Sequence, residues 1–178
     1  MKERAGVTVW FTGLPCCGKT TIADHVADIL KKKGCKVERL DGDIIRQGLT
    51  NDLGFSRNDR DENIRRVTFV AKMLTRNGVI VLASFVSPYR EQRRNARSEI
   101  QHFIEVYVRC PVEICMKRDV KGMYQKAIEG KITHFTGVDD PYEEPEHPEL
   151  IIDTDKETVE ESIAKVLKTL EDHGVVTP

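Results

Sequence analysis

Residues 13–20 have the types and spacing that are needed to hold a chain of phosphate groups. They read GLPCCGKT and match the G-x-x-x-x-G-K-[ST] pattern of phosphate-binding P-loops. Glycines let the backbone turn and approach closely, so that successive N–H groups and the positive end of the following helix can stabilise phosphate oxygens. We expect Lys19 to reach the β- and γ-phosphates and the Thr20 hydroxyl to bind Mg²⁺. An ordinary strand–helix turn would not need every fixed position, so the pattern predicts a nucleoside triphosphate site.

Two carboxylates, Asp41 and Asp43, follow the second predicted strand and could act on the other reactant. Ligands of parallel α/β sheets bind outside the carboxyl ends of the strands, so these side chains and Ser87 are expected beside the phosphate loop. In small-molecule kinases of this architecture, a carboxylate placed there meets an acceptor hydroxyl as a base or holds the metal. A plain Asp-Gly turn explains the same residues, and on this motif alone both interpretations stay open.

The elements that must position these residues alternate along the chain. Strands are predicted at 7–12, 36–40, 79–83, 103–108 and 150–152, and the apolar runs at 7–12 and 79–83 are typical of buried strands. Amphipathic segments predict helices from 21 to just before Gly34, from 64 to about 77, at 90–97, from 111 through 118 towards 122, and at 159–170. Thr154 and Glu157 have the spacing of a capping box for the last helix. This order predicts one domain, residues 1–178, with a five-stranded parallel sheet in a three-layer α/β/α arrangement.

The composition argues against several classes of function. Lys and Arg total 28 against 29 Asp and Glu, so no global field attracts nucleic acid or an anionic membrane. A local nucleic-acid patch on the basic helix at 90–97 is disfavoured in so neutral a chain. No apolar run approaches the length of a bilayer span and no signal-peptide core follows Met1, so we expect a cytoplasmic protein. The five cysteines are odd in number and lack C-x-x-C spacing, which indicates reduced thiols.

A P-loop alone does not separate a kinase from a GTPase switch or an ATP-driven motor. A GTPase switch would carry the guanine-reading pattern N-K-x-D, which this sequence lacks. Residues 119–122 match the weak D-x-x-G pattern, but they follow the fourth strand, where no γ-phosphate sensor is expected. The carboxylates close the second strand instead, which favours a small-molecule kinase.

Four further blocks resemble the adenylylsulfate kinase (APS kinase) family. They are DGD-x-x-R-x-GL-x-x-DLGFS-x-x-DR-x-ENIRR at 41–66, FVSPYR at 85–90, RDVKG-x-Y at 118–124 and FTGVD at 135–139. The similarity extends from Val7 to about Thr154 in the family's order and spacing. It implies a P-loop NTPase fold with a mobile lid at 118–122. It also implies transfer of the γ-phosphoryl group of ATP to the ribose 3′-hydroxyl of adenosine 5′-phosphosulfate (APS), with Mg²⁺ as cofactor, in sulfate assimilation.

The resemblance gives roles to residues that the predicted elements leave unexplained. Phe55 and Phe135 match rings that sandwich the acceptor adenine, although residues that merely anchor loops to a core would look the same. Arg46, Arg60 and Asn63 match contacts to the phosphosulfate and its surroundings, for which guanidinium groups are suited through their paired donors.

The P-loop pattern and the resemblance together assign every expected site residue. Catalytic roles are expected for Lys19, Asp41, Ser87 and Lys121, and metal binding for Thr20 and Asp41. ATP binding is expected from Gly13, Leu14, Pro15, Cys16, Cys17, Gly18, Lys19, Thr20, Thr21 and Arg118. APS binding is expected from Asp43, Arg46, Phe55, Arg60, Asn63, Val86, Ser87, Lys121, Gly122, Phe135 and Thr136. For Ser87 we expect a hydrogen bond on the acceptor side and not an obligatory covalent intermediate, because in-line phosphoryl transfer needs little covalent chemistry from the protein.

The sequence leaves open several partners and alternative functions. The resemblance implies a homodimer and leaves open an association or fusion with ATP sulfurylase. Another P-loop kinase acting on a nucleoside or sugar hydroxyl is the second interpretation. A non-catalytic nucleotide-binding relative is the third, and the intact Lys19, Asp41 and Lys121 argue against it.

Overall fold

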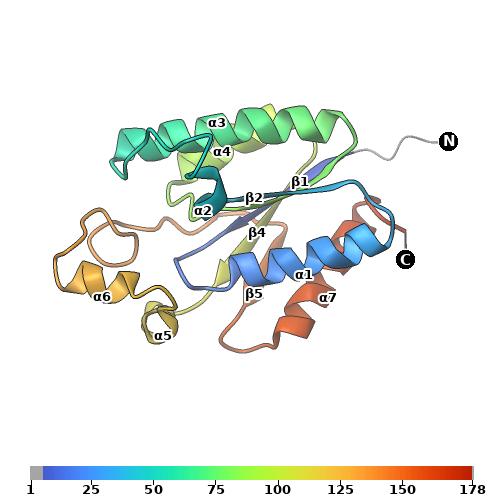
Figure 1. Ribbon diagram of the computed structural model, residues 1–178. Helices are drawn as coiled ribbons and strands as arrows, with labels where there is room; N and C mark the ends of the chain where they lie inside the picture. Colours follow the sequence, from blue (N-terminus) through green and yellow to red (C-terminus); the bar gives the residue numbers. More distant parts are fainter. Residues whose placement is uncertain (1–5, 178) are drawn as a thin grey trace.

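The computed structural model describes residues 6–177, and a five-stranded sheet forms its centre (Figure 1). The strand order is β2-β3-β1-β4-β5, and every neighbouring pair is parallel. Each strand lies within one residue of its predicted range at both ends, so the predicted parallel sheet is confirmed. The strands are β1 Val7–Thr12, β2 Val37–Asp41, β3 Ile80–Ser84, β4 Phe103–Arg109 and β5 Leu150–Asp153.

Helices cover both faces of this sheet, which confirms the three-layer arrangement. α1 and α7 pack together on one face, and α3 and α4 pack together on the other (Figure 1). No helix within residues 6–177 is both long and apolar enough to cross a membrane. The helices are α1 Lys19–Lys32, α2 Gly42–Ile45, α3 Arg57–Arg76, α4 Arg90–Glu99, α5 Val112–Arg118, α6 Met123–Ile128 and α7 Val159–Asp172.

The side chains of β1 alternate between two hydrophobic clusters. Val9 and Phe11 pack beneath α1 and α7, whereas Trp10 packs beneath α3 and α4. All six residues of the strand are buried, as expected at the centre of a parallel sheet. The carboxyl end of β1 is therefore held from both sides, which fixes the origin of the loop at residues 13–18.

The capping box of α7 lies four residues beyond the predicted one. The Thr158 hydroxyl accepts a hydrogen bond from the Glu161 backbone N–H, and the Glu161 carboxylate accepts one from the Thr158 N–H. The predicted cap, Thr154, donates its hydroxyl to the Cys17 carbonyl oxygen at 2.8 Å instead. The T-x-x-E spacing occurs twice here, and a tertiary contact decides which copy caps the helix.

Two short helices follow β4 where one longer helix was predicted. α5 ends at Arg118, and α6 begins after Gly122, whose φ of 63° lies in the left-handed region. The Asp119 carboxylate accepts hydrogen bonds from the N–H groups of Tyr124 and Gln125 at the start of α6. Desolvation raises the pKa of Asp119, but these backbone hydrogen bonds outweigh it and hold that pKa below its usual range.

A buried ion pair fixes the loop that follows β3. Arg93 in α4 is 3% exposed and donates to the Glu105 carboxylate on β4 at 2.9 Å. The same guanidinium donates to the carbonyl oxygens of Ser87 and Glu143. One side chain thus joins the helix, the sheet and two loops, and its loss would leave the buried Glu105 carboxylate with Arg97, at 3.4 Å, as its remaining side-chain partner.

We expect Arg93→Ala to lower the free energy of unfolding by about 3–5 kcal/mol, the usual effect of removing one partner of a buried pair. Arg94→Ala is the matched control, because Arg94 is the exposed neighbour on the same helix, and it should change that free energy by no more than about 0.5 kcal/mol. Urea denaturation of both variants measures the difference. Equal effects would contradict the structural role given to Arg93.

Candidate active site

The loop between β1 and α1 has the backbone shape of an anion-binding loop. Gly13 lies so close to β4 that a Cβ atom there would stand 2.3 Å from the Val108 carbonyl oxygen. Cys16 and Gly18 have φ angles of 61° and 106°, both in the left-handed region. Left-handed residues placed among right-handed ones turn successive N–H groups towards one side, where they can bind an anion.

Lys19 and Thr20, the first residues of α1, face two different partners. Lys19 is 8% exposed, and its ammonium group donates to the carbonyl oxygens of Gly13 and Leu14 at 2.9 and 2.7 Å. It therefore lies inside the phosphate loop. The Thr20 hydroxyl donates to the Asp41 carboxylate at 2.8 Å, so the structure joins the P-loop to the carboxylate motif after β2.

Asp41 ends β2 and caps the one-turn helix α2, which the sequence did not predict. Its carboxylate accepts from the Asp43 N–H at 3.0 Å and from Thr20, and the Arg39 guanidinium lies 3.6 Å away. The oxygen atoms of Thr20 and Asp41 are the ligands that Mg²⁺ prefers, and Mg²⁺ takes its remaining ligands from water and phosphate. Within residues 6–177 no group of three His, Cys, Asp or Glu side chains could hold a metal. The two oxygen donors of Thr20 and Asp41 fit a magnesium ion that takes its other ligands from a nucleotide and water.

Arg118 reaches back from α5 to the start of α1. Its guanidinium donates to the hydroxyl and the carbonyl oxygen of Thr154 at 3.1 and 2.7 Å. These residues form one wall of a pocket of about 340 Å³ beside the phosphate loop. Val159, which its periodicity places on a buried stripe, is 39% exposed and lines this pocket. The lining residues are Cys16, Gly18, Thr21, Ile22, Arg118, Val120, Thr154, Glu157, Val159 and Ser162.

The segment between α2 and α3 places Phe55 beside two guanidinium groups. The Phe55 ring is 52% exposed, and the guanidinium carbons of Arg46 and Arg60 stand 4.2 and 5.9 Å from its centre. Arg46 also donates to the carbonyl oxygens of Leu53 and Gly54. Burial, and then the nearby Arg60 charge, lower the pKa of Arg46. Two adjacent cations at an exposed ring suit a ligand that carries both a flat base and an anion.

Arg60 joins this segment to the loop before β5. Its guanidinium donates to the carbonyl oxygens of Phe55 and His134 and to the Thr136 hydroxyl. Arg60 is only 9% exposed, and the Asp140 carboxylate lies 3.5 Å from its guanidinium. One arginine therefore holds together the two segments that carry Phe55 and Phe135, which lie far apart in the sequence.

Asn63 and Phe135 both have structural partners in addition to their predicted roles. Asn63 is 6% exposed, and its side-chain oxygen accepts from the Thr50 hydroxyl at 2.8 Å. Phe135 is half-buried and meets the Tyr124 ring edge-on, with 4.9 Å between the ring centres. Phe135 thus packs against the core and keeps part of its surface exposed.

The segment at 118–122 reaches the carboxylates that follow β2. Lys121 forms an ion pair with Asp43, and the two side chains are 59% and 68% exposed. Gly122 is the N-cap of α6. An exposed ion pair contributes little to stability. The effect of this contact is to hold the segment at 118–122 beside Asp43.

Ser87 lies in a buried network of hydroxyl groups. It is 3% exposed with a φ of 38°, and its hydroxyl accepts from Trp10 Nε1 and donates to the Thr12 hydroxyl, both at 3.0 Å. Thr12 donates in turn to the Val86 carbonyl oxygen at 2.8 Å. The single proton of the Ser87 hydroxyl is therefore already engaged, which suits a residue that positions the loop after β3.

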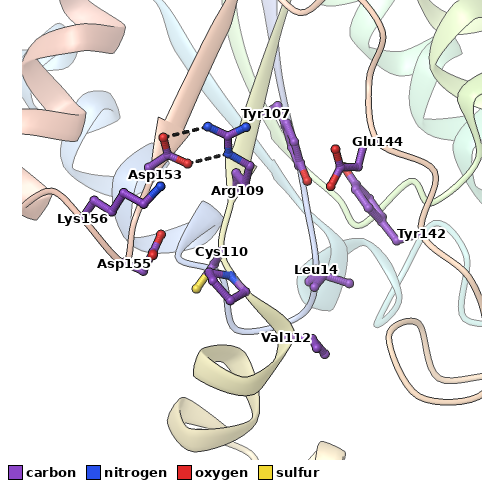
Figure 2. Close-up of a pocket in the computed structure, with 11 residues that line it drawn as sticks. Leu14, Tyr107, Arg109, Cys110, Val112, Tyr142, Glu144, Asp153, Asp155 and Lys156 are labelled. Carbon is purple, nitrogen blue, oxygen red and sulfur yellow. Dashed lines mark hydrogen bonds and ion pairs between the residues drawn. The ribbon is translucent and has the colours of Figure 1, made fainter.

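A larger cavity, of about 420 Å³, lies at the carboxyl ends of β4 and β5 (Figure 2). Of the predicted site residues, only Leu14 lines it. The Arg109 guanidinium binds both carboxylate oxygens of Asp153 there, as Figure 2 shows. Glu144 and Asp155 add two carboxylates to the lining, against one further lysine. This acidic lining suits a polyphosphate less well than the smaller pocket beside the P-loop does.

Sequence reasoning misses three residues that the structure places at the site. Thr154 bridges α5 to the phosphate loop, Arg39 pairs with Asp41, and Tyr124 donates its hydroxyl to the Pro15 carbonyl oxygen at 3.1 Å. The charge of Arg39 inside a predicted strand could have indicated that this residue pairs with a carboxylate. Thr154 and Tyr124 contact residues more than a hundred positions away, and no local pattern reports such contacts.

Known proteins resemble this chain along almost its whole length. Residues 5–153 match the family model of adenylylsulphate kinase. The adenylyl-sulfate kinase of Halothermothrix orenii is 60% identical over 176 residues, which cover 99% of this chain and 95% of that protein. The structure of the Mycobacterium tuberculosis APS kinase in complex with AMPPNP and APS has a TM-score of 0.90 at 44% identity, covering 94% of this chain and 98% of that chain.

A hexameric APS kinase from Thiobacillus denitrificans has a TM-score of 0.75 at 37% identity and covers 98% of this chain, although only 30% of its own chain is matched. The P-loop, the carboxylates after β2 and the parallel sheet described above agree with these likenesses. The chain belongs to the adenylylsulphate kinase family.

Proposed function

We propose that this protein transfers the γ-phosphoryl group of ATP to the 3′-hydroxyl of APS, which yields 3′-phosphoadenosine 5′-phosphosulfate and ADP. The observation that carries the proposal is the hydrogen bond between Thr20 and Asp41, because it joins a P-loop to the carboxylates after β2. A pocket beside Arg118 and an exposed ring with two cations at Phe55 provide places for two nucleotides. Membership of the family identifies those nucleotides.

The donor site is the phosphate loop together with the 340 Å³ pocket beside it. Lys19 would exchange its carbonyl partners for the β- and γ-phosphate oxygens, and the loop N–H groups would hold the rest. The Arg118 guanidinium and the apolar Val120 and Val159 side chains suit the flat adenine of ATP. Thr20 and Asp41 would hold Mg²⁺, which neutralises negative charge on the transferring phosphate.

The acceptor site is the region held together by Arg60. Phe55 and Phe135 offer aromatic surface for the adenine of APS, and Arg46 and Arg60 offer positive charge for the phosphosulfate. Thr136 is buried and accepts a hydrogen bond from Arg60, so it would orient that guanidinium, and the buried Asn63 lies three residues further along α3. The carboxylates Asp41 and Asp43 would then lie between the two nucleotides.

Transfer would be direct, in line from ATP to the 3′-hydroxyl. The Asp41 carboxylate already accepts two hydrogen bonds and faces Arg39, which favours a role on the metal side and in orienting the hydroxyl. Ser87, whose hydroxyl is engaged with Trp10 and Thr12, would position the loop that receives the acceptor. No covalent step through the protein is needed.

The segment at 118–122 would act as a lid. Lys121 lies against Asp43, so closure of this segment would bring a positive charge next to both substrates and exclude water. Exclusion of water matters because water would otherwise compete with the 3′-hydroxyl and waste ATP.

We also propose a cytoplasmic homodimer, as the family resemblance implies. The hexameric relative from Thiobacillus denitrificans, of whose chain this one covers 30%, supports an oligomeric enzyme that can be part of a longer chain. ATP sulfurylase is the partner that the resemblance suggests. Light scattering of the purified protein measures the oligomeric state directly.

The function is tested by incubation with Mg-ATP and APS, with adenosine and gluconate as alternative acceptors in parallel. We expect the 3′-phosphorylated product from APS alone. Lys19→Ala should fold normally and lose at least about a hundredfold in kcat, the range for removing a donor that stabilises transition-state charge. Transfer only to adenosine or gluconate, or normal turnover by the variant, would overturn the assignment.

Asp41 and Asp43 should differ in the kinetic constant that they affect. Asp41→Asn keeps the size of the side chain but removes its charge, and we expect a fall in kcat of about a hundredfold or more. Asp43→Asn removes only an exposed ion pair with Lys121, so KM for APS should rise by up to about fivefold with kcat little changed. Steady-state kinetics with varied APS decides between them, and full kcat in Asp41→Asn would show that the roles are wrongly assigned.

Phe135 should control both acceptor affinity and inhibition by excess APS. If the lid arranged by ATP is also part of the APS site, APS that binds first can trap a closed form that admits no ATP. We therefore expect substrate inhibition by APS, strongest when ADP is present. Phe135→Ala should weaken APS binding by about 1–3 kcal/mol, the usual contribution of a base stacked on an aromatic ring, and should relieve the inhibition.

Initial rates over a wide APS range measure both effects, with Phe69→Ala as the control because Phe69 is 59% exposed and lies nine residues along α3 from Arg60. Simple saturation in the wild type would contradict the shared-lid explanation. So would a Phe135→Ala enzyme that loses affinity but is equally inhibited.

A further inference from the structure

Tyr124 is a buried tyrosine that touches the phosphate loop from the lid side. It is the second residue of α6 and is 1% exposed. Its hydroxyl donates to the Pro15 carbonyl oxygen at 3.1 Å. Burial raises the pKa of this hydroxyl well above its ordinary value, so it keeps its proton and remains a donor.

The other side of Tyr124 meets the loop that carries the acceptor ring. The Phe135 ring lies edge-on to it, with 4.9 Å between centres and 78° between planes. Gly137, at φ 94°, brings its backbone so close that a Cβ atom would stand 3.2 Å from the Leu14 side chain and 3.6 Å from the Tyr124 hydroxyl. The acceptor loop is thus pressed against both Tyr124 and the phosphate loop.

The start of α6 connects the same tyrosine to the carboxylates after β2. The Asp119 carboxylate accepts from the Tyr124 N–H at 3.1 Å, and Lys121, within the same turn, pairs with Asp43. A shift of Tyr124 would therefore move both Phe135 and Lys121, which approach the proposed acceptor site from opposite ends of this segment.

We propose that Tyr124 is a positioning residue that couples occupancy of the phosphate loop to the geometry of the acceptor site. The inference rests on the proposed function. The Pro15 carbonyl and the Cys16 N–H belong to one planar trans peptide group, in which they point in opposite directions. P-loops bind phosphate through such N–H groups. Phosphate that orders the Cys16 N–H must therefore also order the carbonyl oxygen that Tyr124 binds, and through it the Phe135 ring.

Such coupling is reciprocal. Mg-ADP should raise the affinity for APS, and APS should raise the affinity for Mg-ADP by the same factor. Coupling factors of this kind are about 5- to 150-fold. Tyr124→Phe keeps the ring contact with Phe135 and removes the hydroxyl, which donates to the Pro15 carbonyl oxygen and also meets the Cys115 thiol. We expect this variant to bind each ligand alone within about twofold of the wild type, with a coupling factor close to one, since the route between the sites is cut.

Isothermal titration of APS into the protein, with and without saturating Mg-ADP, measures the coupling factor. Tyr107→Phe is the matched control, since it removes a tyrosine hydroxyl in the separate 420 Å³ cavity, and it should retain the wild-type factor. A purely structural role for Tyr124 would lower the melting temperature and leave the coupling factor unchanged. An unchanged factor in Tyr124→Phe overturns the proposal.

Amide hydrogen exchange of the wild type provides a second test that needs no variant. Mg-ADP alone should increase protection of residues 123–137, and unchanged exchange there overturns the coupling. The incubation of the wild type with Mg-ATP and APS distinguishes failure of the proposed function from failure of the role given to Tyr124. If the wild type phosphorylates APS but Tyr124→Phe keeps its coupling, only the role of Tyr124 is wrong; if APS is not phosphorylated at all, the proposed function fails first.

Discussion

The hydrogen bond between the Thr20 hydroxyl and the Asp41 carboxylate is the contact on which the site depends. β1 and β2 are not neighbours, because β3 lies between them. Their carboxyl ends nevertheless meet at one edge, since all strands of the sheet are parallel. This edge places a loop that can hold a triphosphate next to carboxylates that can face a second substrate.

The proposed acceptor side is built differently, from α3 and loop segments and not from the sheet. Arg60 is the organising residue, because its buried guanidinium binds backbone or hydroxyl groups of Phe55, His134 and Thr136. Hydrogen bonds to a charged group are stronger than neutral ones, so a single arginine can hold two distant segments in register. The site therefore joins a rigid donor half, fixed by the core, to an acceptor half that depends on a few polar contacts.

Much of the fold could be predicted from the sequence, because the central strands β1 and β3 are continuous apolar runs and the P-loop pattern requires a strand before it and a helix after it. The ends of the helices could be predicted less closely than the strands. α3 begins at Arg57, capped by Ser56, although its apolar stripe starts only at Ile64. α6 depends on the Asp119 carboxylate, which no periodic pattern reveals. At the site, motifs identified residues such as Lys19 and Asp41 but not their contacts. The bridges made by Thr154 and Tyr124 arise from tertiary packing, for which one sequence contains no signal.

The central claim is that ATP and the acceptor meet at this edge of the sheet and react in one direct step. The stereochemical course at phosphorus tests it most directly. ATP made chiral at its γ-phosphorus with oxygen isotopes would be turned over with APS, and the configuration of the 3′-phosphate in the product determined. A single in-line transfer inverts the configuration, and this is the result that the arrangement of Lys19, Asp41 and the engaged Ser87 hydroxyl predicts. Retention would require a phosphorylated protein intermediate and would contradict the account.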